Sequence, residues 1–588
     1  MKNITRMIRK CYSVLIYLMA CLFLCSCASQ ATLTGGDKDI TPPKIIKYYP
    51  PNHSVNFKEK QLKFTFDEYI QLASPTDNIL ISPSLSHTPE YILKGKSLVV
   101  KFKNELQAQT TYTLSFLEAL KDITEGNVII TEQFVFSTGN TEDSLVIAGC
   151  LIDAFTSEPC AKIGVMLYEN LNDSAPLKDV PDYFTYTDSK GNFSFNNLPQ
   201  KTFLLFALED KNFNKIYDLP DERIAFADDY IKAYEILKIQ TDTTLLIDKD
   251  KMDSLALTLS LFQFHDTILK FLRKTQIKEA HLQFVFNNEI EKFNITPLDT
   301  NIEDLYLWDF GRKKDTVELF FNHLIDKEIL FQVEANGRIF DTLDINPAAK
   351  TSGGKLRRKS QDSLPEKKIL NYSVANAGEL NRKLTLIFDY PLKEADFAAL
   401  LLLELKKEKK IDSLLNINGE DSIVEINLYD TLIPVVSFED SMHRKLIIDY
   451  PWKNKKSYLL FCRDSVFVSH FNHYNDTIRL DFKTKSTKDY GTLTINYEFE
   501  DTNTYLTQLL NEKKEVLLQD SITSNKIISY EFLHPEKYYL RVIFDDNHNG
   551  RWDTGNYAGK KQAEKVIYFN KTIDVKANWT IEETFSVK

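Results

Sequence analysis

The sequence predicts an all-β protein, built as a tandem array of β-sandwich domains. The chain contains 39 Phe and 28 Tyr but only 18 Gly and 19 Pro, a composition that favours well-formed strands. Apolar and polar residues alternate along many short segments, which is the period of a strand with one buried face. Similar segments recur in the same order along the chain, as they do in repeat arrays. Together these observations predict several antiparallel sandwiches in series.

Length and charge limit the possible functions. At roughly 100–200 residues per domain, 588 residues predict about three to five domains. A hydrophobic content of 43% is enough for several cores. The formal net charge is −11, whereas a general nucleic-acid binder needs a basic surface to displace counterions from phosphates. No nucleic-acid partner is therefore expected.

The N-terminal segment predicts export and a lipid anchor. Basic residues precede an apolar run from Ser13 to Leu24, which predicts a signal peptide over residues 1–26. The following Cys25, Ser26 and Cys27 resemble the lipobox of bacterial lipoproteins, and Cys27 fits the lipidated position because small Ser26 precedes it. An ordinary signal peptide with stray cysteines is the alternative. The resemblance implies a lipid-anchored protein of the outer membrane, of the Bacteroidota type, with residues 27–41 as a tether. The periplasmic face and the cell surface both remain open, with the surface favoured.

The first folded domain is expected over residues 42–140. Apolar residues alternate at Leu62, Phe64 and Phe66, and again at Phe134 and Phe136, which predicts strands of a sandwich. Five segments carry a further signal: Thr41 to Lys44, Phe64 to Tyr69, Lys96 to Val100, Thr111 to Leu114 and Phe134 to Thr138. Together they resemble the bacterial Ig-like domain first described in S-layer proteins.

The second domain is expected over residues 144–235. Its core phrase runs from Thr187 to Pro199 and places an Asp-x-x-Gly turn before the alternating Phe193 and Phe195. This phrase resembles the transthyretin-like domain, also called carboxypeptidase regulatory-like, that is appended to carboxypeptidases and to many bacterial surface proteins. The resemblance implies a β-sandwich that is not catalytic.

Echoes of both units predict the rest of the array. Lys383 to Pro391 and Asp481 to Thr484 repeat the first unit, and Tyr539 to Phe544 parallels Phe203 to Leu208 of the second. The segment from Asp396 to Lys410 fits either a short helix or a buried strand. The expected order is an Ig-like sandwich at 250–347, a linker at 348–365, a second clear Ig-like sandwich at 366–486 and a transthyretin-like sandwich at 488–588.

Two loops rich in Asp and Asn are the candidate metal sites. Oxygen-bearing side chains stand at positions 1, 3, 5 and 9 of each loop, as in the first part of a Ca²⁺-binding loop. The alternative is a β-turn in which Asp and Asn bond their own backbone. The ligand candidates are Asp210, Asn212, Asn214, Asp218 and Asp221 in the first loop, and Asp545, Asn547, Asn549 and Asp553 in the second.

The cysteines and histidines of the folded domains give few further signals. Cys150 and Cys160 flank an expected hairpin and could form a disulfide in an oxidising envelope; otherwise they are small buried residues. Cys462 is expected in a core. The pair His470 and His473 lacks the helical frame of a zinc hydrolase and is expected at the surface.

No motif for catalysis is found. The sequence lacks a Gly-x-Ser-x-Gly elbow, a phosphate-binding Gly-Lys-Ser/Thr loop and a Cys-x-x-Cys pair in the mature chain. The expected function is therefore a non-enzymatic scaffold or protein-interaction subunit that contacts an envelope or outer-membrane protein, with no required cofactor. A glycan-binding lipoprotein is the alternative, for which aromatic side chains could line a surface; an enzyme with a site between domains is the least favoured. The aromatic candidates are Tyr183, Phe184, Trp452 and Trp552.

Overall fold

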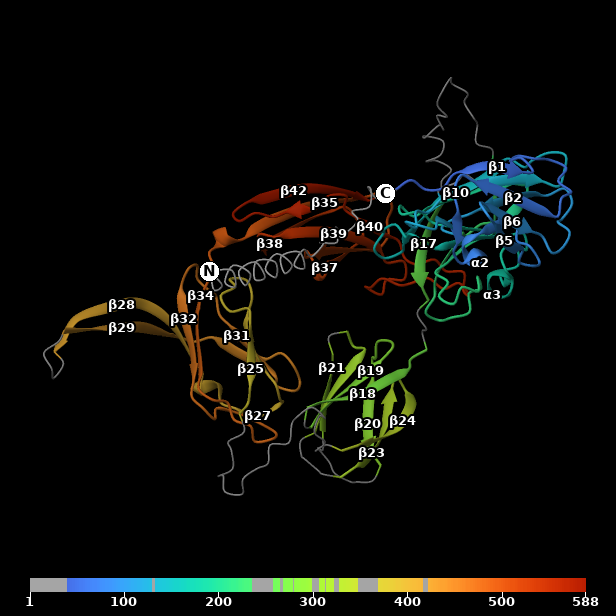
Figure 1. The fold of residues 1–588 in the computed structure, drawn as a ribbon. Coiled ribbons are helices and arrows are strands. Elements are labelled where there is room, and N and C mark those ends of the chain that lie inside the picture. Colours follow the sequence, from blue (N-terminus) through green and yellow to red (C-terminus); the bar gives the residue numbers. More distant parts are fainter. Residues whose placement is uncertain are drawn as a thin grey trace, which may run out of the picture. The chain divides into compact units, whose positions relative to one another are not determined.

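The computed structural model describes most of the chain after its N-terminal segment, and that part is almost entirely β-structure (Figure 1). It divides into two compact units: unit 1 comprises Met1–Leu151 and Pro159–Leu259, and unit 2 comprises Ile152–Glu158 and Ser260–Lys588. The described residues are 40–129, 133–234, 257–264, 268–278, 280–298, 306–311, 313–321, 327–346, 369–415 and 421–587. The expected all-β fold is confirmed.

Unit 1 begins with a sandwich whose two main sheets have the orders β1-β2-β6-β5 and β4-β7-β9. Its strands alternate as predicted: Leu62, Phe64 and Phe66 are buried in β2, whereas Gln61 and Lys63 are exposed. The elements are β1 (Ile45–Tyr49), β2 (Gln61–Phe66), β3 (Ile70–Leu72), α2 (Pro75–Asn78), β4 (Leu80–Ser82), β5 (Glu90–Lys94), β6 (Ser97–Lys101), β7 (Thr111–Ser115), β8 (Leu120–Asp122) and β9 (Phe134–Ser137).

The second domain is built on a sheet of order β12-β11-β14-β15-β17-β10-β13, in which β16 also pairs with β14. Gly191 occupies the left-handed region, with φ of 77°, in the turn that precedes β13. Strands β10 and β17 each continue from unit 1 into unit 2. The elements are β10 (Leu145–Asp153), β11 (Gly164–Tyr168), α3 (Ala175–Lys178), β12 (Tyr183–Tyr186), β13 (Asn192–Leu198), β14 (Thr202–Leu208), β15 (Arg223–Phe226), β16 (Ile231–Lys232) and β17 (Leu257–Gln263).

Unit 2 continues with a domain of two sheets, ordered β18-β19-β22-β21 and β20-β23-β24. In β23 every second residue is buried, from Ile329 to Ala335. The strands are β18 (Phe271–Lys278), β19 (His281–Phe286), β20 (Phe293–Pro297), β21 (Tyr306–Phe310), β22 (Thr316–Phe321), β23 (Ile329–Ala335) and β24 (Arg338–Ile345).

The next domain carries sheets of order β25-β26-β31-β30 and β29-β28-β32-β34, and the pair β27-β33. The segment that fitted either a helix or a strand is a strand for most of its length, after one 3-10 turn. Strands β28 and β29 extend as a hairpin beyond the sheet (Figure 1). The elements are β25 (Tyr372–Ala375), β26 (Leu384–Phe388), β27 (Leu392–Ala395), η1 (Phe397–Ala399), β28 (Leu401–Leu415), β29 (Asp421–Leu432), β30 (Val435–Phe438), β31 (Lys445–Asp449), β32 (Ser457–Cys462), β33 (Phe467–Ser469), β34 (Ile478–Lys483) and η2 (Thr487–Asp489).

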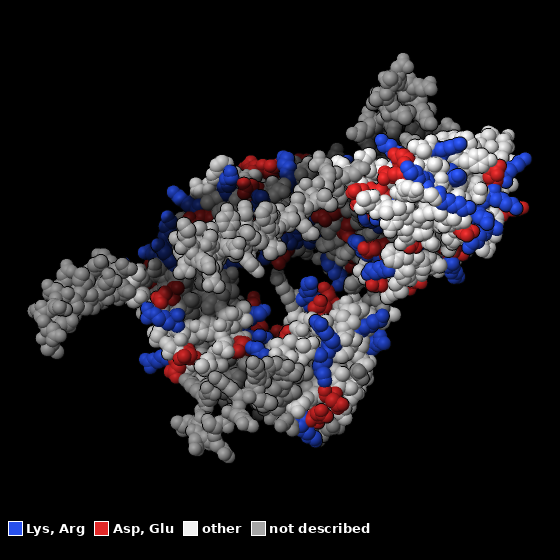
Figure 2. All heavy atoms as spheres, viewed as in Figure 1, with Lys and Arg blue, Asp and Glu red and all other residues white. Residues whose placement is uncertain are grey.

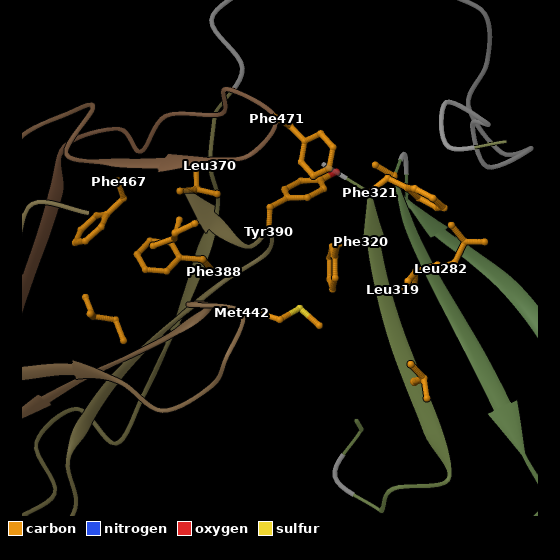
Figure 3. Close-up of a cluster of buried hydrophobic side chains, with 14 of the residues drawn as sticks. Leu282, Leu319, Phe320, Phe321, Leu370, Phe388, Tyr390, Met442, Phe467 and Phe471 are labelled. Atoms are coloured by element: carbon orange, nitrogen blue, oxygen red, sulfur yellow. The ribbon is translucent and has the colours of Figure 1, made fainter. Parts of the chain in front are cut away.

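One buried cluster joins these two domains of unit 2 (Figure 3). Phe320 of β22 points toward Tyr390 and Met442 of the following domain, and the guanidinium of Arg444 lies 4.7 Å from the Phe320 ring centroid. The His281 ring also stacks on the Phe320 ring, with ring centroids 4.0 Å apart. The continuous core indicates that these two domains pack directly on one another.

The C-terminal domain contains sheets of order β38-β35-β42 and β37-β36-β39-β40, and β41 pairs with β39. Strands β35 and β42 run parallel, whereas the other pairings of this domain are antiparallel. The strands are β35 (Gly491–Phe499), β36 (Tyr505–Leu510), β37 (Val516–Ile522), β38 (Lys526–Leu533), β39 (Lys537–Phe544), β40 (Val566–Tyr568), β41 (Ile573–Asp574) and β42 (Thr580–Val587).

Candidate functional site

The two Asp/Asn loops occupy corresponding places in two domains. The first follows β14 and leads into β15 in unit 1, and the second follows β39 and leads into β40 in unit 2. Each preceding strand is a largely buried central strand of its sheet. The strands therefore hold both ends of each loop in place.

In the first loop, polar side chains organise the backbone. The Asp210 carboxylate accepts the N–H groups of Asn214 (3.3 Å) and Lys215 (2.7 Å). The Oδ1 atoms of Asn212 and Asn214 accept the N–H two residues further on, at 3.1 and 2.7 Å. The side-chain amides of Asn212 and Asn214 donate to the Asp218 carboxylate, at 3.0 and 2.7 Å. Four of the predicted ligand residues therefore meet in one turn.

The second loop repeats this network at the same offsets. The Asp545 carboxylate accepts the N–H groups of Asn549 and Gly550, both at 2.9 Å. The Oδ1 atoms of Asn547 and Asn549 accept the N–H two residues further on, at 3.1 and 2.9 Å. Asp553 accepts the side-chain amides of Asn547 and of Asn549, the latter at 2.7 Å. Because the same hydrogen-bond network occurs in both domains, we attribute this turn to the domain type.

The sixth position of each loop lies in the left-handed region. Gly550 has a φ of 76° and Lys215 a φ of 61°. Glycine adopts this conformation without steric cost, whereas a residue with a Cβ is strained there. The first loop therefore keeps the same turn with a less suitable residue.

A buried glutamate supports each loop, and neither glutamate is among the residues predicted from the sequence. Glu222 is fully buried, and its carboxylate accepts the N–H groups of Lys211 (3.1 Å) and Leu219 (3.1 Å). Glu564 is 2% exposed and accepts the N–H groups of Asp546 (3.2 Å) and Asp553 (2.8 Å).

Burial raises the pKa of the Glu564 carboxyl, against the opposing effect of the Asp553 and Asp546 amides. The two glutamates stand at different distances from the start of their loops, so loop spacing alone did not identify them. The shared signal is a glutamate followed by a basic residue at the entry to the next strand, Glu222-Arg223 and Glu564-Lys565.

The donor set partly suits a hard cation. Carboxylate and amide oxygens are the ligands that Ca²⁺ prefers. The NH₂ groups of Asn212 and Asn214 now donate to Asp218, and rotating each amide would present its oxygen instead. Asp221 is engaged elsewhere, because Lys211 Nζ lies 2.8 Å from its carboxylate and that hydrogen bond lowers the pKa of Asp221. Within the described residues, no three His, Cys, Asp or Glu side chains converge as a metal cluster, so such a site would depend on asparagine and backbone oxygens.

The cysteines of the hairpin are not joined in a disulfide. Cys150 pairs with Asn192 on β13, and its sulfur lies 3.5 Å from the Thr258 hydroxyl. Cys160 donates its N–H to Leu151, the next residue of β10. Successive residues of a strand point to opposite faces, so this register aligns Cys160 with the neighbour of Cys150. Of the two residues, Cys160 is buried as the alternative expects, whereas Cys150 is half-buried.

Other predicted positions have mixed outcomes. Cys462 is fully buried as expected, and burial raises the pKa of its thiol to about 11. His470 and His473 are both half-buried, and the His473 ring packs edge-on against Tyr390, with centroids 4.7 Å apart. Cys27 lies outside the described residues.

Two of the four aromatic candidates for a glycan-binding surface are buried, and two are half-buried. Tyr183 and Phe184 are 4% and 7% exposed and lie in strand β12, so the prediction that they line an exposed surface is wrong. Trp452 packs against Tyr458 at a centroid distance of 5.1 Å. Trp552 packs over its own loop, where it donates its indole N–H to the Glu564 carbonyl (2.8 Å), and it also contacts the distant Phe155.

Charged side chains of both signs are interspersed on the face shown in Figure 2. Within the part of the chain that the structure covers, no helix has the length and apolar character needed to cross a bilayer.

These features define a chain of β-sandwich domains with two repeated polar loops. Residues 39–138 match the sequence model of a family described as bacterial Ig-like domain, which confirms the resemblance predicted for the first domain. No curated protein matches the chain.

Solved structures give remote matches. The S-layer protein rSbsC is 10% identical, with 91% of this chain and 67% of that chain covered and a TM-score of 0.13. The Bacillus anthracis TIE protein is 9% identical, with 94% and 76% covered and a TM-score of 0.14. The major pilin subunit BcpA of Bacillus cereus is 8% identical, with 75% and 99% covered and a TM-score of 0.14. Such low similarity does not indicate a shared function.

Proposed function

We propose that this protein is a non-catalytic, lipid-anchored scaffold or protein-interaction subunit at the outer membrane of a bacterial envelope. The observation that carries the proposal is the organisation of the chain as sandwiches in series, preceded by a lipobox-like segment at Cys27. Sandwich domains present edge strands and loops on which partner proteins dock. The burial of Tyr183 and Phe184 weakens the glycan-binding alternative.

Lipidation of Cys27 is tested by replacement with alanine. In cells fed an alkyne-labelled fatty acid, C27A is expected to lose the label and to leave the membrane fraction, because several acyl chains are needed for stable anchoring. The matched control is C25A, which removes the neighbouring cysteine and is expected to keep the label. Full labelling of C27A would contradict the proposal.

The partner is tested by in-cell cross-linking, followed by purification of the tagged lipoprotein and mass spectrometry. We expect one envelope or outer-membrane protein to be captured at stoichiometric yield, with cross-links to loops or edge strands of the sandwiches. Absence of any stoichiometric protein, together with retention of the purified chain on a polysaccharide column, would favour the glycan-binding alternative instead.

We further propose that the two Asp/Asn loops bind Ca²⁺. At Ca²⁺ about 100 times its Kd, binding to the folded state is expected to add about 2.7 kcal/mol to the free energy of unfolding. D545N is expected to reduce the calcium-dependent rise in melting temperature, because Asp545 is buried at the start of the second loop. D546N removes the same charge from the exposed neighbour and serves as the control. Identical melting curves in chelator and in excess Ca²⁺ would refute the calcium site.

A further inference from the structure

In the C-terminal domain, the sheet β37-β36-β39-β40 buries both of its faces: the inner face, which packs on the domain core, and the opposite face. The inner face contributes Tyr505, Leu509 and Val542 to the domain core. The opposite face would be expected to be polar if it met water. Instead, Leu506, Ile543 and Val566 are 0%, 1% and 7% exposed and form a separate cluster. We name as the outer face Leu506, Gln508, Arg541, Ile543, Val566 and Tyr568, which the register places in two adjacent rows.

A short segment from elsewhere in the sequence covers this outer face. Unit 2 includes the turn Ile152–Glu158, and the Phe155 ring lies 4.9 Å from Trp552 and 4.3 Å from the Arg541 guanidinium. The Ser157 hydroxyl donates to the Val566 carbonyl at 3.0 Å. A surface ion pair at the edge joins Glu158 and Lys514 at 2.5 Å.

The turn is organised by its own hydrogen bonds. The Asp153 carboxylate accepts the N–H groups of Phe155 (3.0 Å) and Thr156 (2.8 Å), and the Asp153 carbonyl accepts that of Ser157 (2.9 Å). A turn held in this way loses little conformational entropy when it docks. Phe155 is therefore presented as a preformed anchor.

The second half of β17 completes the cover. Leu261 accepts the N–H of Ala154 (2.9 Å), and the Thr554 hydroxyl donates to the Gln263 carbonyl (2.7 Å). A Cβ on Gly555 would lie 2.5 Å from the Phe262 ring, so only glycine allows this approach. The loop that carries the candidate calcium ligands thus also receives both covering segments.

We propose that Ile152–Glu158 is a reversible latch that closes on the outer face of the C-terminal sheet of the same chain, with Phe155 as its anchor. Arg541 is 5% exposed, and among the described residues its hydrogen bonds go to the neutral Gln508 (2.5 Å) and Tyr568 (3.0 Å). Closing the latch removes the Arg541 guanidinium from water. These two hydrogen bonds and the contact with the Phe155 ring compensate for the lost hydration. The cost of desolvating Arg541 reduces the free energy gained when the latch closes. The latch therefore also opens, and opening exposes the outer face.

Carbodiimide cross-linking of the full-length protein tests the latch, because it joins lysine to carboxylate only where the two groups touch. The readout is the yield of the Lys514–Glu158 peptide relative to Lys201–Glu169, an ion pair within unit 1 at 2.6 Å. F155A is expected to lower this ratio roughly ten-fold. F213A, which removes a ring that is 76% exposed, is expected to leave the ratio unchanged.

A second variant acts from the other side of the contact. G555A is expected to lower the same ratio, because its added methyl group displaces Phe262. A wild-type ratio in both F155A and G555A would overturn the proposal, and retention of Lys201–Glu169 reports that unit 1 is folded. In an equal mixture of ¹⁵N-labelled and unlabelled protein, the cross-linked peptides are expected to carry one isotope only. Mixed pairs would show that the turn docks on a second copy, and would also overturn the latch.

Discussion

Replacing Phe136 with alanine is expected to lower the free energy of unfolding of the first sandwich by about 3–5 kcal/mol. Phe136 lies in β9, is fully buried and stands at the centre of an aromatic cluster. The cavity left by the ring is expected to collapse poorly, because its rigid neighbours hold one another in place. Its ring contacts, by centroid distance, are Phe57 (4.5 Å), Tyr112 (5.4 Å), Phe102 (6.0 Å) and Phe134 (6.1 Å).

Hydrogen exchange resolved by peptide is the appropriate measurement, since a chain of several domains does not unfold in one step. F136A is expected to lose protection in β2, β6 and β7, which share the core of β9, while the C-terminal domain keeps its protection. F213A deletes an exposed ring of the same kind and is expected to change stability by less than about 0.5 kcal/mol. Equal protection in F136A and the wild type would contradict the assignment of Phe136 to the core.

The first sandwich is the part of the fold that the sequence predicts best. Its strands have one buried face, so alternation at Leu62, Phe64 and Phe66 directly reports which side chains point inward. The segment after Asp396 was ambiguous because an unbroken run of leucines fits both a helix and a buried strand. It became a strand because β32 and β29 pair with it on either side.

The candidate site was predicted in outline. The repeated spacing of Asp and Asn identified the loops, since oxygen donors at alternate positions close a turn locally. The supporting Glu222 and Glu564 could not be found in this way, because they reach the loop through tertiary structure and not through a fixed spacing. The contact of Phe155 with Trp552 was equally hidden, as nearly four hundred positions separate the two residues in the sequence.

Replacing Glu379 is expected to have the second large effect on stability. This residue lies at the junction between the last two domains of unit 2. The Glu379 carboxylate is 14% exposed and accepts hydrogen bonds from Lys485 Nζ (2.6 Å) and the Tyr490 hydroxyl (2.8 Å). His534 Nε2 lies 3.4 Å away. Burial alone would raise the pKa of Glu379, but the bonds from Lys485 and Tyr490 outweigh burial and lower it. Burial and the bond to Glu379 raise the pKa of Tyr490 to about 12.

We expect E379Q to lower the free energy of unfolding of this junction by about 1–3 kcal/mol at pH 7, because the Lys485 ammonium and the Tyr490 hydroxyl lose a charged acceptor. The folded-state pKa of Glu379 lies below that of an unfolded glutamate, about 4.3. Its contribution is therefore complete above that pH and is lost as the pH falls through the folded-state value. The wild type should lose this stabilisation in acid, whereas E379Q should lack that part of the pH dependence.

Peptide-resolved hydrogen exchange over η2 and the start of β35, followed from pH 7 downward and corrected for the intrinsic exchange rate, measures both effects. E394Q removes a carboxylate that is 65% exposed in the same domain, and is expected to keep the wild-type pH profile because exposed ion pairs contribute little. Coincident acid profiles for E379Q and the wild type would mean that Glu379 does not control the junction. A profile in which only E379Q is flat would identify this carboxylate as the group whose charge holds the two domains together.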